Sequence, residues 1–443
     1  SPQDHLLRPT IGRAPGVATR LDDNSHCLAC HAGHGDFAGV TKDDVGVISS
    51  GEPPLSVVRA VQDHMRNAAM PTLESQYDPQ GSGVGRCDTC HMPQTAIAAT
   101  TTTDAAGFTV GDLTSHRFQT IWPRASELYG VTNSCSACHP LVDGDPAQAV
   151  IEEWLSDSDE DEGFHADTPR NFQNGIANAE RDGGVYCAQC HTTEGFLRIQ
   201  WGGETLDQDE VNHIVKDALA RDQGITCNAC HGARPDGTFV GDTNPLRFEA
   251  DELCGRCHNA ETVVFEDFRD HGEIVRHPQK EMIDGTAGAE VDGLGDYGDT
   301  AHSASALFPK NCVNCHYDRD AGTENHEFEV RSATCSRCHD GIDTFDRPAF
   351  ADFDGDGEIE GIQTEVSDLL DLLEEALLDD PLVSRDASGY FQYDGATDRE
   401  MTGASEAQKR AVFNHYSVDF DGSLGVHNAV RAVQLLQRSY QEL

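Results

Sequence analysis

Positive charge is scarce in this sequence. Its 443 residues include 31 Lys and Arg against 77 Asp and Glu, which gives a formal net charge of −46 at pH 7. The phosphates of nucleic acids and anionic lipid surfaces would repel such a chain, so we expect no nucleic-acid partner. The acids are spread along the whole chain, which favours adaptation to high salt over one patch that steers a basic partner or cations. The lysines number only five: Lys42, Lys216, Lys280, Lys310 and Lys409.

Long apolar runs are absent as well. No stretch approaches the roughly 18 apolar residues that a membrane-spanning helix needs, so we expect no membrane insertion. No secretory leader precedes Ser1, and we expect the chain to be the mature form of an exported protein.

Cysteine never occurs outside one motif. All 16 cysteines lie in eight Cys-x-x-Cys-His pentads, numbered here as sites 1 to 8 in chain order. A zinc knuckle pairs two Cys-x-x-Cys halves, and a redox dithiol does not need a following His. Eight repeats that all end in His, with no cysteine left over, exclude both and also a disulfide framework. The cysteines are Cys27, Cys30, Cys87, Cys90, Cys135, Cys138, Cys187, Cys190, Cys227, Cys230, Cys254, Cys257, Cys312, Cys315, Cys335 and Cys338.

This pentad is typical of covalent haem c attachment. The two thiols form thioethers to the haem vinyl groups, and the adjacent imidazole becomes the proximal iron ligand. The sequence therefore predicts eight c-type haems as cofactors. Their proximal ligands are His31, His91, His139, His191, His231, His258, His316 and His339.

Eight haems in 443 residues leave about 55 residues for each, too few for a separate apolar core around every haem. Aromatic residues make up only 7% of the chain, so the porphyrins must supply much of the buried apolar surface. The predicted fold is mostly irregular with short α-helices, wrapped around a chain of eight haems, with a helical C-terminal segment. We expect little sheet and an extended, Thr-rich loop around Ala96–Asp104.

Three regions follow from the spacing of the motifs. Residues 1–145 hold sites 1 to 3, residues 146–345 hold sites 4 to 8, and residues 346–443 hold no cysteine. The closely spaced motifs that begin at Cys227 and Cys254, and at Cys312 and Cys335, are expected to place successive haems side by side. Apolar residues in the last region predict a helix that packs in the core, and a second one begins near Asn428. The first helix carries Ile362, Val366, Leu369, Leu370, Leu373 and Leu377 at helical spacing.

The sixth ligand of each iron comes from thirteen histidines outside the pentads or from five methionines. Because histidines outnumber methionines and suffice for all eight irons, we expect two histidines on every iron. His302 and His326 precede sites 7 and 8 closely enough to reach their own or an adjacent haem, and His34 can serve a neighbouring haem. His5 and His26 could bind iron across a subunit boundary. His213 and His271 are reserve candidates.

Short segments of the chain resemble large multihaem cytochromes. They include Phe164–Asp167 before site 4, Asp354–Gly357, and Gly425–Asn428 before an apolar helix. His427-Asn428 and the Cys90–Pro93 segment are also similar to the wider superfamily of cytochrome c nitrite reductases and octahaem enzymes. The resemblance implies that His116, His165, His277 and His427 are distal ligands. With His34, His64, His302 and His326 they complete a set of eight.

Electron transfer is the predicted function, since two histidines on each iron leave no position for a substrate. The alternative is an octahaem reductase of a nitrogen or sulfur oxyanion with one open haem, although no Cys-x-x-Cys-Lys occurs. Haem c is attached outside the cytoplasmic membrane, so we expect an extracellular or cell-surface protein, or else a periplasmic one. Expected partners are redox proteins, mineral or electrode acceptors, or further copies of the chain in a head-to-tail filament.

A calcium loop is the last candidate site. Acids at its first, third and fifth positions and Gly357 after them match the opening of a calcium-binding loop, although the twelfth position is Gln363 in place of Glu. A solvated turn is the alternative. The candidate ligands are Asp352, Asp354, Asp356, Glu358 and Glu360.

Overall fold

The structure is a computed structural model of the chain. It describes residues 24–48, 53–67, 79, 85–92, 95–104, 106–113, 120–121, 126, 129–134, 150–151, 153–154, 165, 184–221, 224–232, 246–260, 263–303, 311–317, 326, 328–395 and 399–443.

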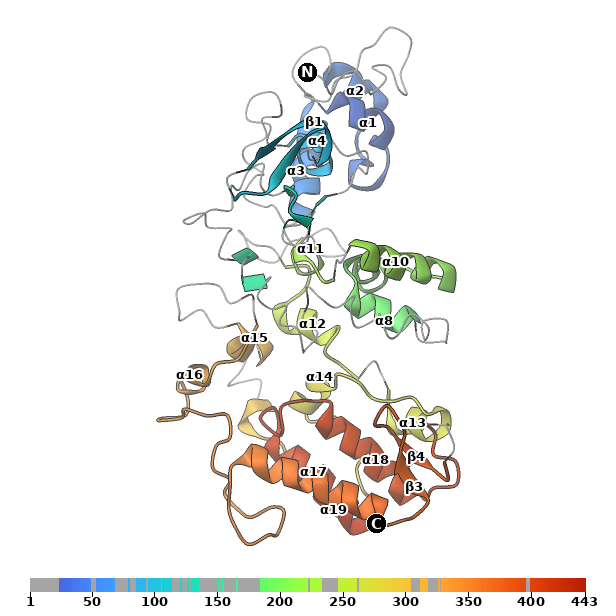
Figure 1. The fold of residues 1–443 in the computed structure, drawn as a ribbon, viewed down its shortest axis with the longest axis vertical. Helices are drawn as coiled ribbons and strands as arrows, with labels where there is room; N and C mark the ends of the chain where they lie inside the picture. Colours follow the sequence, from blue (N-terminus) through green and yellow to red (C-terminus); the bar gives the residue numbers. More distant parts are fainter. Residues whose placement is uncertain are drawn as a thin grey trace. The chain divides into compact units, whose positions relative to one another are not determined.

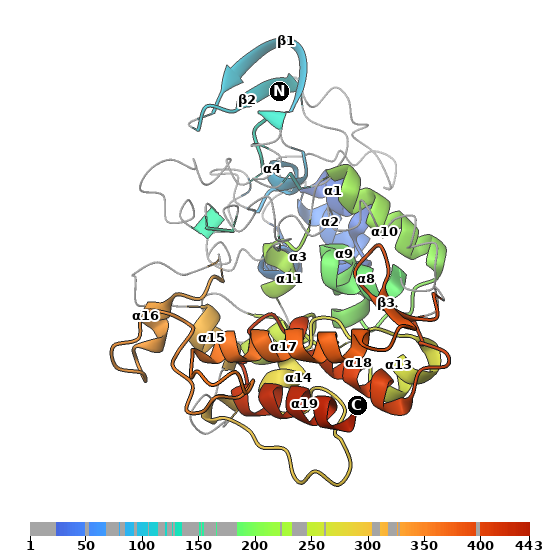
Figure 2. The same ribbon diagram turned by 60° about the horizontal axis from the view of Figure 1, so that its bottom comes forward.

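Two compact units make up the chain. The N-terminal unit comprises residues 1–249 with 322–327, and the C-terminal unit comprises residues 250–321 with 328–443. The described residues are mostly helical or irregular, with only short strands (Figures 1 and 2). The three predicted regions follow the motif spacing rather than these units and stay a prediction. Among the described residues, no helix has the length and apolar character that crossing a bilayer requires.

Short helices dominate the N-terminal unit. The α1, α2 and α3 helices share a small apolar cluster that includes Leu28, Val45 and Val57. A second cluster joins α8 to α10 through Ala188 and Val211. The helices are α1 (Ser25–His31), η2 (Gly35–Phe37), α2 (Lys42–Ile48), α3 (Leu55–Asn67), α4 (Cys87–His91), α8 (Gly184–His191), α9 (Thr193–Gly195), η6 (Phe196–Trp201), α10 (Gln208–Arg221) and α11 (Cys227–Cys230).

A β-hairpin replaces the predicted extended loop. The β1 strand (Ala96–Thr103) pairs antiparallel with β2 (Thr109–Leu113), with Thr103 opposite Thr109. The turn is closed by Asp104, whose Oδ1 accepts hydrogen bonds from the Ala106 and Phe108 N–H groups. The extended conformation was predicted correctly, but the loop assignment was wrong, because β-branched Thr residues favour pairing once a turn brings the partner strand alongside.

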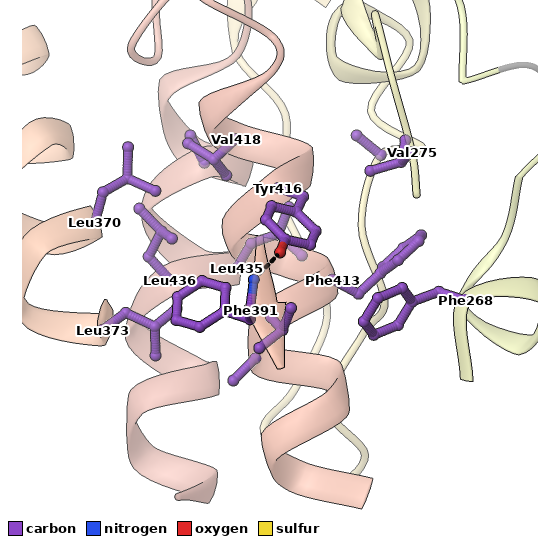
Figure 3. Packing of buried hydrophobic residues seen from close by; sticks show 14 of the residues in the cluster. Phe268, Val275, Leu370, Leu373, Phe391, Phe413, Tyr416, Val418, Leu435 and Leu436 are labelled. Atoms are coloured by element: carbon purple, nitrogen blue, oxygen red, sulfur yellow. Dashed lines mark hydrogen bonds between the residues drawn. The ribbon is translucent and has the colours of Figure 1, made fainter. Parts of the chain in front are cut away.

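The C-terminal unit has a conventional apolar core. It is built mainly by α17 (Ile362–Leu378), α18 (Glu406–Asp419) and α19 (Ala429–Glu442), which lie side by side (Figures 1 and 2). Leu373, Leu435 and Leu436 are completely buried there. Figure 3 shows Tyr416 beside Phe391, whose N–H donates a 2.7 Å hydrogen bond to the tyrosine hydroxyl. The remaining elements are α12 (Ala250–Gly255), α13 (Phe265–His271), α14 (Gln279–Ile283), η7 (Ala301–Ser303), α15 (Asn311–His316), α16 (Ser332–Cys335), β3 (Val383–Arg385) and β4 (Phe391–Tyr393).

The helical spacing found in the sequence corresponds to α17, which buries five of the six predicted apolar residues. Asn428 caps α19 by accepting a hydrogen bond from the Arg431 N–H. The α18 helix was not predicted, because residues 411–418 are buried without interruption, polar Asn414 and His415 included. A helix buried on all sides carries no amphipathic stripe.

Candidate haem-binding sites

Each described pentad begins on a short helical segment. The helix includes both cysteines of the motif at sites 1, 2, 4, 5 and 7, and their i and i+3 positions there lie on one face. At sites 6 and 8 the helix ends before the second cysteine. Where a backbone hydrogen bond from the histidine N–H to the first cysteine carbonyl closes the turn, the imidazole stays close to the thiols. This bond measures 2.9 Å for His231, 2.9 Å for His258 and 2.8 Å for His339.

No disulfide joins the fourteen described cysteines. Burial raises the pKa of Cys227 to about 11 and that of Cys230 to about 12, so both thiols are neutral at pH 7. The Cys27 thiol is hydrogen-bonded to Cys87, which lowers the pKa of Cys27. Cys312 is hydrogen-bonded to Cys254 in the same way. Sites 1 and 2, and sites 6 and 7, therefore lie beside each other within their units.

Each of five proximal histidines has a second histidine near it, and the five distances are similar to one another. The distance between ring centres ranges from 5.9 Å to 6.5 Å. In every pair the second residue is one of the predicted distal ligands, and both residues belong to the same compact unit. The pairs are His91 with His64 at site 2, His231 with His326 at site 5, His258 with His277 at site 6, His316 with His427 at site 7, and His339 with His302 at site 8.

This spacing fits a metal ion held between two imidazoles. A metal–imidazole bond is about 2 Å long and the ring nitrogen lies roughly 1 Å from the ring centre, so two axial ligands place their ring centres about 6 Å apart. The donor set also matches haem iron, which accepts imidazole on both faces. The residues of these five sites could therefore hold a haem c iron.

Hydrogen bonds at Nδ1 orient four of these imidazoles. His64 Nδ1 lies 2.8 Å from Asp36 Oδ2, and His427 Nδ1 lies 2.6 Å from Asp421 Oδ1. Backbone carbonyls accept the other two bonds: Val426 O from His302 at 2.7 Å, and Phe328 O from His316 at 3.0 Å. With Nδ1 engaged as donor, Nε2 is the nitrogen that can bind iron.

Burial keeps several of the imidazoles neutral, the form that binds a metal. Desolvation lowers the pKa of His277, His316 and His339, and nearby positive groups lower it further. For His339 these groups include Arg347. At His316 the hydrogen bond to Phe328 O opposes this shift. His427 differs: burial alone would lower its pKa, but the hydrogen bond and charge of Asp421 outweigh burial and raise it.

The His277 backbone has a conformation that non-glycine residues seldom adopt. Its φ is 51°, in the left-handed region, and Pro278 follows it directly. A residue in this region costs free energy that the surrounding structure has to repay, and such residues gather at functional sites. The strained turn places the His277 ring 6.5 Å from that of His258.

The other predicted ligands are not in these five pairs. His34 is exposed, and His165 is half-buried with its carbonyl accepting a 2.7 Å hydrogen bond from the Ile225 N–H. The described proximal residues His31 and His191 are likewise outside the pairs. The reserve candidates His213 and His271 are exposed on α10 and α13. His5, His116, Cys135, Cys138, His139 and the side chain of His26 lie outside the described residues.

The predicted calcium loop gathers most of its carboxylates. Asp352, Asp354 and Asp356 form one group whose oxygens lie within 4.8 Å of one another, and Asp354, Glu360 and Glu365 form a second. Glu358 is in neither group. Burial, together with neighbouring carboxylates, raises the pKa of Asp354 and of Glu360.

Glu365 was not predicted for this loop, because it lies beyond the expected twelve positions. Its side chain is completely buried and accepts hydrogen bonds from the N–H groups of Phe353 at 2.6 Å and Glu360 at 3.1 Å. The sequence also did not predict that the carboxylates of Asp36 and Asp421 bind His64 and His427. A contact between an acid and a histidine across a loop leaves no periodic signal in the sequence.

No protein-family model matches the chain, and no curated protein matches it. Among solved structures, the chain is similar to the undecaheme cytochrome from the S-layer of Carboxydothermus ferrireducens, with 21% identity and a TM-score of 0.38. The match covers 60% of this chain and 39% of that one, so the chain spans well under half the length of that protein.

Proposed function

We propose that this chain is an octahaem c-type cytochrome that transfers electrons, with two histidines on each iron. The observation that carries the proposal is the set of five proximal imidazoles, each with a second imidazole at 5.9–6.5 Å between ring centres. Eight Cys-x-x-Cys-His motifs supply the covalent attachment points. Haem iron supplies reversible one-electron chemistry when bound.

The ligand set favours electron transfer over catalysis. Two imidazoles on one iron leave no coordination position for a substrate, and the hydrogen bonds at Nδ1 of His64, His302, His316 and His427 hold these rings in place. For sites 1, 3 and 4 we propose His34, His116 and His165 as distal ligands, without assigning each to one iron. A reductase with one open iron is the alternative that the first experiment has to exclude.

Neighbouring sites support electron transfer within each compact unit. The thiol contacts between Cys27 and Cys87, and between Cys254 and Cys312, bring two pairs of sites side by side. Site 8 belongs to the same neighbourhood, because the Cys335 charge adds to burial in raising the pKa of Cys315. We propose that electrons pass between these neighbouring sites.

Location and assembly are further parts of the proposal. Covalent haem attachment outside the cytoplasmic membrane supports an extracellular or cell-surface protein whose partners are redox proteins, minerals or electrodes. The finer proposal is a head-to-tail filament in which His5 or His26 binds an iron of the neighbouring copy. Electron microscopy of the purified protein tests it: filaments are expected, and monomers alone at high concentration would contradict it.

Carbon monoxide binding to the dithionite-reduced protein tests the electron-transfer function. CO needs an open position on ferrous iron, so we expect no change in the optical spectrum. Binding to about one haem in eight would show an open iron, and nitrite, hydroxylamine and tetrathionate would then be the substrates to test.

A structural calcium ion in the loop at Asp352 is a separate proposal. Asp352, Asp354, Asp356 and Glu360 would supply oxygen ligands, the type that calcium prefers. Thermal melting with and without a chelator tests this proposal. A lower melting temperature after chelation is expected, and an unchanged melt would count against the ion.

A further inference from the structure

The short segment between α18 and α19 contacts the distal histidines of two sites. It contains Asp421, which binds His427 of site 7, and Val426, whose carbonyl accepts from His302 of site 8. We propose that Asp421 is a positioning residue that gives the iron at site 7 a more negative reduction potential than the irons at sites 2 and 8. This inference rests on the proposed ligation of that iron by His316 and His427.

The contact between Asp421 and His427 is short and buried. Its N–O distance is 2.6 Å, and the side chains of His427 and Asp421 are 20% and 1% exposed. The Ser423 hydroxyl donates to the other carboxylate oxygen, which fixes the orientation of the carboxylate. No water can compete easily for an acceptor buried to this degree, so the hydrogen bond keeps most of its strength.

A carboxylate acceptor changes what the imidazole offers to iron. Drawing the Nδ1 proton toward Asp421 gives His427 more negative charge at Nε2 and makes it a stronger electron donor. The more negative ligand stabilises ferric iron, which carries one more positive charge than ferrous iron. The reduction potential of the site therefore shifts in the negative direction.

Sites 2 and 8 have weaker versions of this contact. His64 at site 2 also binds a carboxylate, Asp36, at 2.8 Å, but the two side chains are 35% and 36% exposed. His302 at site 8 binds the neutral carbonyl of Val426 at 2.7 Å. Hydrogen bonds to charged acceptors are stronger than those to neutral ones, and water weakens exposed contacts. Site 7 combines charge with burial, and it alone among these three does so.

The test is a spectroelectrochemical titration of the holoprotein with Asp421→Asn. Asparagine keeps the shape and a neutral acceptor but removes the charge. About one eighth of the haem absorbance change is expected to move to more positive potential. The matched control is Asp36→Asn, which removes the exposed carboxylate at site 2 and should cause a smaller shift in the same direction. Equal shifts in the two variants, or no shift in Asp421→Asn, would overturn the inference.

Ser423→Ala gives a second measurement with the opposite sign. Without the hydroxyl donor, the Asp421 carboxylate becomes a stronger acceptor, so the same fraction of the titration should move to more negative potential. A positive shift in this variant would contradict the proposed role of the carboxylate. Haem content by pyridine haemochrome and the ferric low-spin EPR spectrum show whether each variant is fully loaded and six-coordinate.

His427→Ala separates this inference from the proposed function. If His427 is an iron ligand, this variant should bind CO at about one haem in eight. CO binding by His427→Ala together with unchanged potentials in Asp421→Asn would reject the role of Asp421 and leave the ligation intact. Absence of CO binding by His427→Ala would reject the ligation itself, and with it the basis of this inference.

Discussion

Under the proposed ligation, a single imidazole decides whether an iron stays closed to outside ligands. His326 lies 6.4 Å from His231 between ring centres, and its backbone N–H donates to Glu153 at 3.1 Å. We expect His326→Ala to open one iron, so that about one haem in eight of the reduced protein binds CO. The measurement is the optical difference spectrum after CO addition. His271→Ala, at an exposed histidine of α13, is the control and should bind none; equal CO binding by the two variants would contradict the assignment.

His415 makes the C-terminal core sensitive to acid. It is 4% exposed, and burial lowers its pKa from 6.5 to about 4. Between these two values the unfolded chain binds the proton more readily than the folded chain, so stability falls as the pH drops from 6.5 to 4. The loss can reach about 3 kcal/mol for a shift of this size.

Thermal melts of the wild type and His415→Gln between pH 7 and pH 4 measure this effect. The variant should lose less stability than the wild type over this interval, since it lacks the buried titrating group. Parallel pH profiles would reject the prediction. The comparison between the wild type and His415→Gln isolates the effect of His415, because both proteins share every other histidine.

The sequence identified histidines that lie close to proximal histidines, but it did not identify the groups that orient them. Their ligation of iron stays a prediction. A pentad is a local motif with fixed covalent chemistry, and all five imidazoles opposite proximal histidines were among the eight predicted distal ligands. Which histidine reaches which iron was left open. His302 precedes site 7 in the chain but lies 6.1 Å from His339 of site 8, and only the path of the chain in space decides that.

Among the elements, α17 contributes several leucines to the apolar core of the C-terminal unit. Leu373 is completely buried in it, whereas Leu378 on the same helix is 39% exposed. Leu373→Ala should lower the free energy of unfolding of the C-terminal unit by about 2–5 kcal/mol, because it removes apolar contacts and leaves a cavity. Chemical denaturation followed by circular dichroism measures the loss. Leu378→Ala is the control and should cost far less; similar losses would contradict the assigned packing.

Two amphipathic helices of the C-terminal unit, α17 and α19, were predicted from the sequence, whereas the long buried run of α18 was not. The apolar stripe from Ile362 predicted α17, and the segment after Asn428 predicted α19. The buried run of α18 lacks such a stripe, so sequence periodicity misses it. Glu365 was missed for a related reason: it lies in the first turn of α17, outside the loop pattern, yet its carboxylate accepts hydrogen bonds from loop backbone groups.

For the whole molecule, charge is the dominant property. A net charge of −46 destabilises the compact state by self-repulsion, which salt screens. We expect the melting temperature to rise steadily as NaCl increases from about 0.1 M to about 2 M, where the Debye length falls to a few ångströms. Differential scanning calorimetry measures it. A melting temperature that does not change with salt would contradict adaptation to high salt and favour a role of the acidic surface in steering a partner.

Motif spacing along the chain did not reveal the two compact units. Residues 322–327 belong to the N-terminal unit although both flanking segments belong to the C-terminal one, and His326 within this excursion faces His231. This segment brings His326 close to His231, which is far from it in the sequence. No local composition or periodicity marks it.

The neighbouring residues Val426 and His427 also bear on how the protein is made. The last cysteine is Cys338, yet Val426, which orients His302 at site 8, and His427, which would complete site 7, lie almost ninety residues further along the chain. Under the proposed ligation, a chain released before residue 426 would carry all its covalent cofactors but leave an iron exposed to peroxide and oxygen. Covalent haem attachment and closure of this iron would thus be separate steps of assembly, and the second step would depend on the folding of the segment between α18 and α19.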